Sequence, residues 1–421
     1  MRHPLAHAGF VLPCALVMVP ACGGGEFSWA GTMTDSAGVM IVSNPSVGMW
    51  SPGEEWTVVE EVRIGVVEGD SDYVFGDVGG VTVDSHGRIF VLDVQAQHVK
   101  VFSPEGEYEQ TIGGPGGGPG ELADAYFPPA VGIGDTLLVP DARGNRRVNR
   151  FAPDGSSIGS FPMPVQDAVV LDVAGTRSGM AVLWARPFAF PGQPEPDRID
   201  RILALSSDGS AVDTLLTFPS GRTFSMGGPS FELVIYAAEP AWEITEDSKL
   251  VFGVTDQSRL GIYSWGGRLE RVIEKPVERR QITDRDKERY MGQVEQSTQE
   301  FLRFPEFYPC FNDVIVGPDQ TIWVQHVRTI SELTDGELET LVNTSYRVQR
   351  IITALRKFSG TEDWDVFDAE GRYLGVVTMP LRISLPAARG ENIYGVWRDE
   401  LDVQYVVRLR IVGDLTERGA P

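Results

Sequence analysis

The stretch VTVDSHGRIFVLDVQAQHVKVFSPEGEYEQTI, residues 81–112, decides the fold. Two apolar segments flank the turn at 84–87, and two more flank the turn at 103–106. Glycine ends each turn, which permits the left-handed backbone that a tight antiparallel turn requires. The stretch therefore predicts two hairpins that together form one four-stranded antiparallel unit.

Both hairpins recur along the chain. The first kind occurs six times, at 81–93, 130–141, 170–184, 242–256, 313–326 and 383–397. The second kind interleaves with it, as FSPEGEYEQTI, FAPDGSSIGSF, LSSDGSAVDTL, YSWGGRLERVI and FDAEGRYLGVV. A β-sandwich gives no reason for two turn types to alternate in strict order. The pattern predicts an all-β, six-bladed β-propeller of four-stranded antiparallel blades.

The ends of the chain provide the missing strand of the sixth blade. After its first hairpin this unit has only one more strand, at 402–412, while an extra strand at 56–65 precedes the first unit. Pairing the two closes the ring and removes exposed sheet edges. Helical spacing of apolar residues at 283–303 and 335–358 predicts one or two helical insertions around blade five.

The composition excludes some classes of protein. The chain has 421 residues, 42% of them hydrophobic, and a net charge of −23. This much apolar material excludes general disorder. Binding of nucleic acid needs a basic stripe, and none is visible in the sequence.

The N-terminus predicts export. An apolar run at 10–19 is too short to cross a bilayer and fits a secretory signal. It closes with Val-Pro-Ala-Cys and a glycine run, which resembles the bacterial lipoprotein signal with Cys22 as the lipid-attachment site. The alternatives are an ordinary signal peptide cut after residue 21 and a buried N-terminal strand. Cys310 is expected to be a small buried hydrophobe. We therefore divide the chain into a lipoprotein-type signal peptide (1–21), a leash and lead-in (22–55), the propeller (56–413) and a tail (414–421).

The propeller sequence also resembles a known family. The run GVTVDSHGRIFVLDVQAQHVKVFSPEGEYEQTIG (80–113), followed by GPGEL, is similar to bacterial six-bladed β-propeller lipoproteins related to NHL repeats. The similarity extends to 35–44, 304–324 and 393–411. It implies a propeller in the cell envelope, exported and lipid-anchored, periplasmic or facing the outer membrane. It does not imply a ligand, because one fold hosts many functions.

Propeller geometry divides the polar residues between two faces. The turns within hairpins lie on one face, here called the turn face. The loops between second and third strands and between blades lie on the other, the loop face, where loops of every blade converge. The short turns are expected to offer little concave surface. Charged residues predicted to bind a ligand on the loop face are Asp77, Glu121, Arg143, Arg146, Asp256, Arg259, Arg328, Arg398 and Asp399.

The sequence offers few residues that could bind a metal ion in the channel. Histidine-based zinc catalysis needs several histidines around the channel, and only His86, His98 and His326 remain after the signal, with His86 on the turn face. Calcium needs oxygen ligands, and candidates entering the channel are Asp77, Glu121, Glu232, Asn312 and Asp313. We predict no cofactor and no metal site, leaving calcium open.

The sequence favours a lipid-anchored propeller that acts as a non-catalytic ligand-binding, protein-binding or scaffolding module. The alternative is a calcium- or zinc-dependent propeller hydrolase or lyase that acts in the central channel. We expect a monomer whose partner is a protein or small polar ligand on the loop face and whose only membrane contact is the lipid.

Overall fold

A computed structural model describes residues 29–163, 165, 168–187, 199–220, 233–344 and 359–413. The stretch at 81–112 forms one sheet, in which β4 (Val78–Val83), β5 (Ile89–Asp93), β6 (His98–Phe102) and β7 (Tyr108–Ile112) pair antiparallel in that order. The predicted signal peptide (1–21), Cys22 and the tail (414–421) lie outside the described residues.

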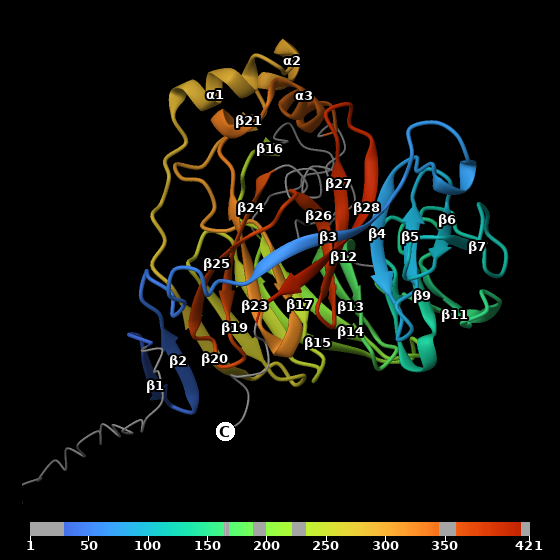
Figure 1. Cartoon of the computed structure of the whole chain (residues 1–421), viewed down its shortest axis with the longest axis horizontal. Coiled ribbons are helices and arrows are strands. Elements are labelled where there is room, and N and C mark those ends of the chain that lie inside the picture. The colour runs from blue at the N-terminus through green and yellow to red at the C-terminus, as the bar shows by residue number, and fades with distance from the viewer. Residues whose placement is uncertain are drawn as a thin grey trace, which may run out of the picture.

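Five further sheets repeat this plan, and the predicted six-bladed β-propeller is confirmed (Figure 1). Blade two holds β8 (Ala130–Val131), β9 (Leu137–Asp141), β10 (Arg147–Phe151) and β11 (Ser157–Pro162). Blade three holds β12 (Ala168–Gly175), β13 (Ala181–Pro187), β14 (Ile199–Leu205) and β15 (Val212–Pro219). Blade four holds β17 (Pro240–Ile244), β18 (Leu250–Val254), β19 (Arg259–Tyr263) and β20 (Leu269–Glu274). Blade five holds β22 (Val314–Val316), β23 (Ile322–Val327), β24 (Gly360–Phe367) and β25 (Tyr373–Thr378). Blade six holds β26 (Ile383–Arg389), β27 (Asn392–Arg398), β28 (Gln404–Val412) and β3 (Thr57–Ile64).

The ring closes as predicted. Strand β3 pairs antiparallel with β28, so the last strand of blade six comes from the N-terminal end of the chain. The register runs from Thr57 opposite Val412 to Ile64 opposite Val406. Closure leaves β28 with partners on both sides.

Each blade is buried on both faces, which explains its continuous apolar strands. In β5, Phe90 and Leu92 pack against Leu137 of blade two, while Ile89 faces Tyr394 of blade six. Side chains alternate across a strand, so a blade held between two neighbours needs apolar residues at odd and even positions alike.

An N-terminal strap (residues 29–64) wraps blades four to six. The hairpin of β1 (Thr32–Ser36) and β2 (Val39–Ser43) adds to the outer edge of blade four, because β2 pairs parallel with β20. The amides of Met49 and Trp50 then donate to carbonyls of β25 in blade five, at 3.2 and 2.9 Å. The chain next enters blade six as β3. The sequence assigned no strands to the lead-in, and the structure corrects this.

The insertions form a cap on the loop face above blades four and five (Figure 1). The cap contains α1 (Asp284–Met291), α2 (Gln296–Gln299) and α3 (Asp335–Thr344), with a parallel pair of β16 (Leu233–Val234) and β21 (Leu302–Arg303). Its own apolar core includes Tyr290, Tyr308 and Leu338. Short 3-10 turns occur at η1 (Ser71–Tyr73), η2 (Ile133–Asp135), η3 (Pro318–Gln320) and η4 (Ile330–Glu332).

The predicted helix at 283–303 is shorter than expected. It begins at Asp284, with Thr283 as N-cap and a capping box to Asp286. It ends at Met291, since Gly292 follows and the chain restarts as α2 and β21. In the second insertion α3 covers 335–344, and residues 345–358 lie outside the described residues.

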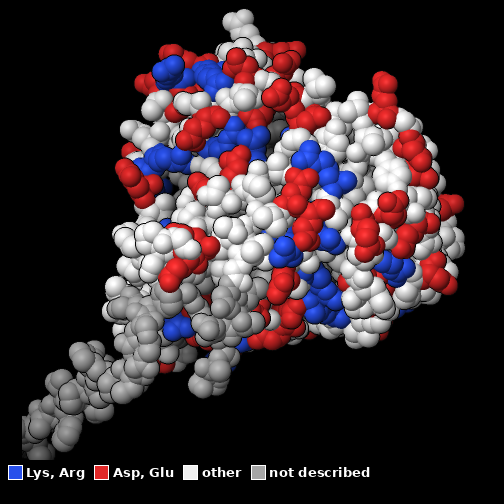
Figure 2. Space-filling model, in the orientation of Figure 1, with Lys and Arg blue, Asp and Glu red and all other residues white. Residues whose placement is uncertain are grey.

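The described surface carries both signs of charge. On the side shown in Figure 2, acidic and basic side chains are interspersed over the blades and the cap. No helix among the described residues has the length and apolar character needed to cross a bilayer.

Candidate functional site

The innermost strands of the six blades surround a cavity on the axis of the propeller. Its volume is about 1060 Å³, and residues of β4, β8, β12, β17, β22 and β26 line it. Aliphatic side chains such as Val81, Val131, Val173 and Ile315 form much of the wall. A cavity of this size matches the pockets in which proteins enclose small molecules.

The cavity reaches the turn face. Arg177, Glu246, Asp319 and Gly390, which belong to the first turns of blades three to six, are part of its lining. The expectation that this face offers little concave surface is wrong. On the turn face, turns of a few residues reverse the chain without covering the mouth of the channel. On the loop face, the inserted loops are long enough to cover the ring.

Three carboxylates lie on consecutive blades in the cavity wall: Asp172 of blade three, Glu243 of blade four and Asp313 of blade five. We call them the acidic wall. Each accepts a hydrogen bond from the next backbone amide in the chain, at 2.9 Å in all three cases. Innermost strands have one edge that faces the channel without a neighbouring strand, so the amides of that edge need side-chain acceptors.

Glu243, the central member of the acidic wall, has a raised pKa. Burial raises the pKa of Glu243 to about 7, the amide of Ile244 opposes the shift, and the charges of Asp313 and Asp172 reinforce it. Glu243 is therefore close to half-protonated at neutral pH, and its carboxyl group can donate or accept a hydrogen bond.

Charged groups of both signs surround the mouth of the cavity. Arg177 of blade three forms an ion pair with Glu246 of blade four. Arg389 of blade six also lines the cavity. In the neighbouring first turns of blades one and two, a hydrogen bond from the Ser85 hydroxyl lowers the pKa of Asp135, and the positive charge of Arg389 contributes. A ligand that enters from the turn face therefore passes between groups of opposite charge.

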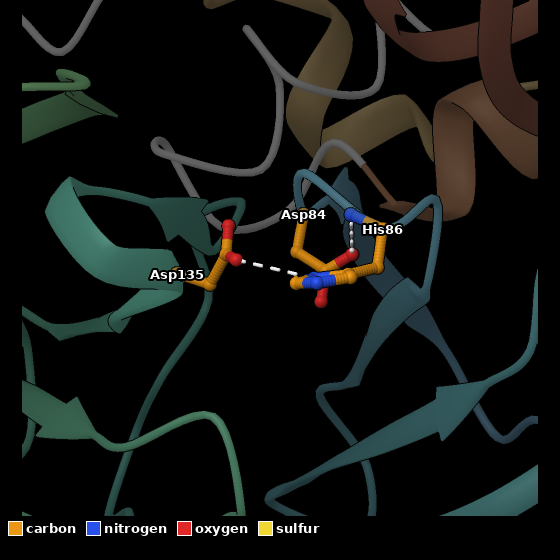
Figure 3. A group of neighbouring side chains, drawn as sticks. All are labelled: Asp84, His86 and Asp135. Carbon is orange, nitrogen blue, oxygen red and sulfur yellow. Dashed lines mark hydrogen bonds and ion pairs between the residues drawn. The ribbon is translucent and has the colours of Figure 1, made fainter.

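Beside this mouth, Asp84, His86 and Asp135 converge from blades one and two (Figure 3). His86 Nδ1 lies 3.3 Å from Asp135 Oδ2. Asp84 is buried and accepts bonds from the His86 amide, at 2.9 Å, and from Arg88 Nε, at 2.7 Å. Among the residues that the structure describes, this is the one group with ligand atoms close enough for a metal. Arg88 already neutralises the charge of Asp84, so the first turn of blade one is stabilised without a metal ion.

The three histidines lie apart. His86 is on the turn face, as expected. Burial lowers the pKa of His98, whose ring lies in blade one. His326 Nε2 contacts Asp365 Oδ1 at 3.1 Å in blade five. Within the described ranges they form no common zinc-ligand group.

The predicted loop-face residues are distributed around the rim. Asp77 and Arg398 lie 3.8 Å apart (Oδ1 to Nη2) where blade six meets blade one. Asp399 accepts bonds from the amides of Leu401 and Val403, both at 2.9 Å, which fixes the turn between β27 and β28. Asp399 therefore acts as a turn cap.

Three more of these residues belong to blade two and the loop before it. Glu121 accepts a bond from the Gly118 amide at 2.6 Å and closes its own loop. Arg143 is exposed, with Nε 3.4 Å from Asp124 Oδ2. Arg146 is also exposed, and its guanidinium donates to the Val165 carbonyl.

Asp256 and Arg259 line a second pocket, of about 580 Å³, beside the N-terminal strap. Cys310 lies in the same pocket, where its thiol donates to the Asp256 carbonyl at 3.4 Å. Burial raises the pKa of the Cys310 thiol, which keeps it in the unreactive protonated form. The thiol is half-buried, less buried than expected.

Arg328 is buried and forms an ion pair with Glu337. Asn312 is also buried, and its amide donates to Gln325 Oε1 at 2.7 Å. Of the calcium candidates, Asp313 lines the cavity, and Glu232 lies outside the described residues. The structure does not bring the nine predicted ligand-binding residues into one site.

Asp172 and Glu243 were not among the residues predicted from the sequence. A signal for them exists, because each stands in the first strand of its hairpin directly before an aliphatic residue, in VLDVAG and AWEITE. Asp313 has the same setting in FNDVIV. Comparing the repeats with one another would have identified a charged residue where the strand pattern predicts an apolar one.

Comparisons with known proteins agree on the fold. A family model described as a 6-bladed beta-propeller matches residues 64–125. The search of curated proteins gives no match. The chain is similar to a solved structure of a duf4221 family member from Bacteroides vulgatus, at 9% identity and TM-score 0.51, over 86% of this chain and 99% of that one.

Two solved enzymes are also similar to the chain, with lower scores. One is a gluconolactonase from Xanthomonas campestris, at 12% identity and TM-score 0.43, over 85% and 99% of the two chains. The other is virginiamycin B lyase from Staphylococcus aureus, at 11% identity and TM-score 0.41, over 85% and 100%. These similarities leave the ligand of this chain open.

Proposed function

We propose that the protein is an exported, lipid-anchored propeller that binds a small polar ligand in its central channel without chemical conversion. The observation that carries this proposal is the cavity of about 1060 Å³, with an acidic wall and a mouth on the turn face. Aliphatic residues of the inner strands would contact the body of the ligand, and the acidic wall would accept hydrogen bonds from its hydroxyl or amino groups.

Native mass spectrometry of the protein purified from envelope membranes tests this proposal. A bound small molecule is expected on the unaltered protein, and its occupancy should fall in Asp172→Asn, Glu243→Gln and Asp313→Asn. These substitutions keep an oxygen that can accept the neighbouring amide, so the inner strands should remain folded.

The matched control lies on the loop face. Arg143→Glu combined with Arg146→Glu changes two exposed groups that do not line the cavity and should leave occupancy of the channel unchanged. If this variant lost the ligand while the acidic-wall variants retained it, the channel proposal would be wrong and the loop face would be the binding surface.

A metal-dependent hydrolase or lyase is the second candidate. The acidic wall favours it, because calcium prefers carboxylate oxygens. Elemental analysis of the purified protein distinguishes the two: stoichiometric calcium that is lost in Asp313→Asn would favour the enzyme. Stoichiometric zinc lost in His86→Ala would instead assign a metal to the group in Figure 3.

Lipid attachment has its own test. Mass spectrometry of the mature N-terminal peptide should detect an acylated Cys22, and Cys22→Ala should leave the signal peptide uncleaved. A mature chain that begins at residue 22 or 23 without lipid would contradict the anchor and leave the channel proposal standing.

A further inference from the structure

The N-terminal strap determines where the chain leaves the propeller. Trp29 is the first described residue, and its indole Nε1 donates to Asn44 Oδ1 at 3.0 Å. The Asn44 amide group in turn donates to the carbonyls of Glu274 in blade four and Gly371 in blade five, at 3.2 and 3.0 Å. The point of exit is therefore fixed to the rim of blade four.

Blade four is the widest blade of the ring. Its sheet has six strands in the order β17-β18-β19-β20-β2-β1, from the channel outward. Five spacings of ~4.8 Å between neighbouring strands place β1 about 24 Å outside β17, the innermost strand. All five residues of β1 are exposed, and Met33 on β1 and Val47 farther along the strap are 40% and 75% exposed.

The tether between the proposed lipid site and the strap is short. Seven peptide units separate Cys22 from Trp29. At ~3.5 Å per residue they span at most about 25 Å. The outer strand of blade one, β7, lies across the ring from β1. Between β1 and β7 lie eight strand-to-strand spacings of ~4.8 Å and the width of the channel. These two outer edges are therefore about 40 Å or more apart.

We infer that the bilayer faces the outer edge of blade four, which leaves blade one as the side farthest from the membrane. This inference rests on the lipid anchor of the proposed function. The acidic body repels anionic headgroups, so the tether and the exposed apolar residues of the strap direct the contact. With blade four toward the membrane, the cavity mouth on the turn face stays open to solvent.

Fluorescence quenching in vesicles tests the orientation. The acylated full-length protein, carrying Cys310→Ser to remove the remaining thiol, is labelled with bimane at Thr34→Cys on β1 or at Glu109→Cys on β7. Both positions are exposed in strands at the outer edges of their blades. The vesicles contain phosphatidylethanolamine, phosphatidylglycerol and a phospholipid with a nitroxide on its headgroup. The label at residue 34 should be quenched several-fold more than the label at 109.

A lengthened tether is the matched control. Twenty Gly and Ser residues inserted after Gly25 add about 25 Å of root-mean-square reach. The difference between the two labels should then shrink, because the body can rotate and move away from the surface. Persistence of the full difference would show that the tether does not set the orientation.

Two results would overturn the inference, and they are distinguishable. Equal quenching at both positions in protein that floats with the vesicles would show that no side is preferred, while the anchor stands. Failure of the protein to float with the vesicles, with no lipid on Cys22, would overturn the anchor and the orientation together.

Discussion

The guanidinium of Arg328 donates to both carboxylate oxygens of Glu337, at 3.0 and 2.8 Å, beneath the N-terminus of α3. Arg382 also donates to this carboxylate, and the Thr334 amide does so at 2.7 Å. Burial alone would raise the pKa of Glu337, but these partners hold it at about 2. The carboxylate therefore joins the cap to blade five and to the chain that enters blade six.

Glu337→Gln is expected to destabilise the protein. The substitution leaves the largely buried Arg328 without its counter-charge, and loss of one partner from such a pair costs about 3 kcal/mol. Urea denaturation at neutral pH measures the change. Glu339→Gln, at an exposed position of the same helix, should change stability by less than about 0.5 kcal/mol. Equal effects of the two would show that the ion pair is not the cause.

The advantage of the unaltered protein over Glu337→Gln should depend on pH. The folded pKa of about 2 lies below the ordinary value of 4.5, so the stabilising contribution is fully present above pH 4.5. It is lost as the pH falls from 4.5 through 2, because the folded carboxylate must then be protonated. Denaturation curves of both proteins across this window measure the difference, which should shrink toward acid pH.

Glu243 should show the opposite dependence. Its folded pKa of about 7 lies above the ordinary 4.5, so between these values the folded protein keeps a proton that the unfolded chain has released. The stability of the unaltered protein relative to Glu243→Gln should fall as the pH rises from 4.5 to 7 and then level off. A flat difference across this range would contradict the raised pKa.

Asn44→Ala should weaken the attachment of the N-terminal strap to blades four and five. The side chain is 6% exposed and accepts a bond from the Tyr373 amide at 2.7 Å in addition to its three other bonds. Leaving buried backbone groups unpaired costs about 2 kcal/mol. Limited proteolysis should then cleave near residues 37 and 38 faster than in the unaltered protein. Ser46→Ala, in an exposed part of the strap, is the control and should not change the rate.

Ending the chain after Glu400 should open the ring. The truncation removes β28, which is the partner of both β27 and β3. Exposed edges and re-exposed apolar residues should lower the melting temperature and promote aggregation. Ending the chain after Gly413 removes only the predicted tail and should leave melting unchanged. An unchanged melting temperature in the shorter variant would refute closure by β3 and β28.

The fold was predictable because its information is local. Glycines such as Gly87 and Gly106 have φ of 83° and 89°, and each marks a turn within one repeat. The β1–β2 hairpin was not predictable in this way, since its pairing partner in blade four lies about 230 residues farther along the chain, as for Asn44 and Glu274. The site was missed for a similar reason. The channel opens on the turn face because the loops of the other face are longer and cover the ring. This difference in loop length appears only when all the blades are assembled, so it cannot be read from a single repeat.

Synthesis delivers the strap before the surfaces that it binds. Residues 29–64 leave the ribosome before the blades that they bind. Strand β3 needs β28, and the Thr57 hydroxyl donates to the Val412 carbonyl across 355 residues of sequence. Pairing at this separation raises contact order and slows folding. Until β28 is made, β3 has no partner strand and blade six is incomplete, so both are open to wrong pairing. A nascent chain that ends before residue 404 therefore has an open ring, and its strand β3 has no partner strand.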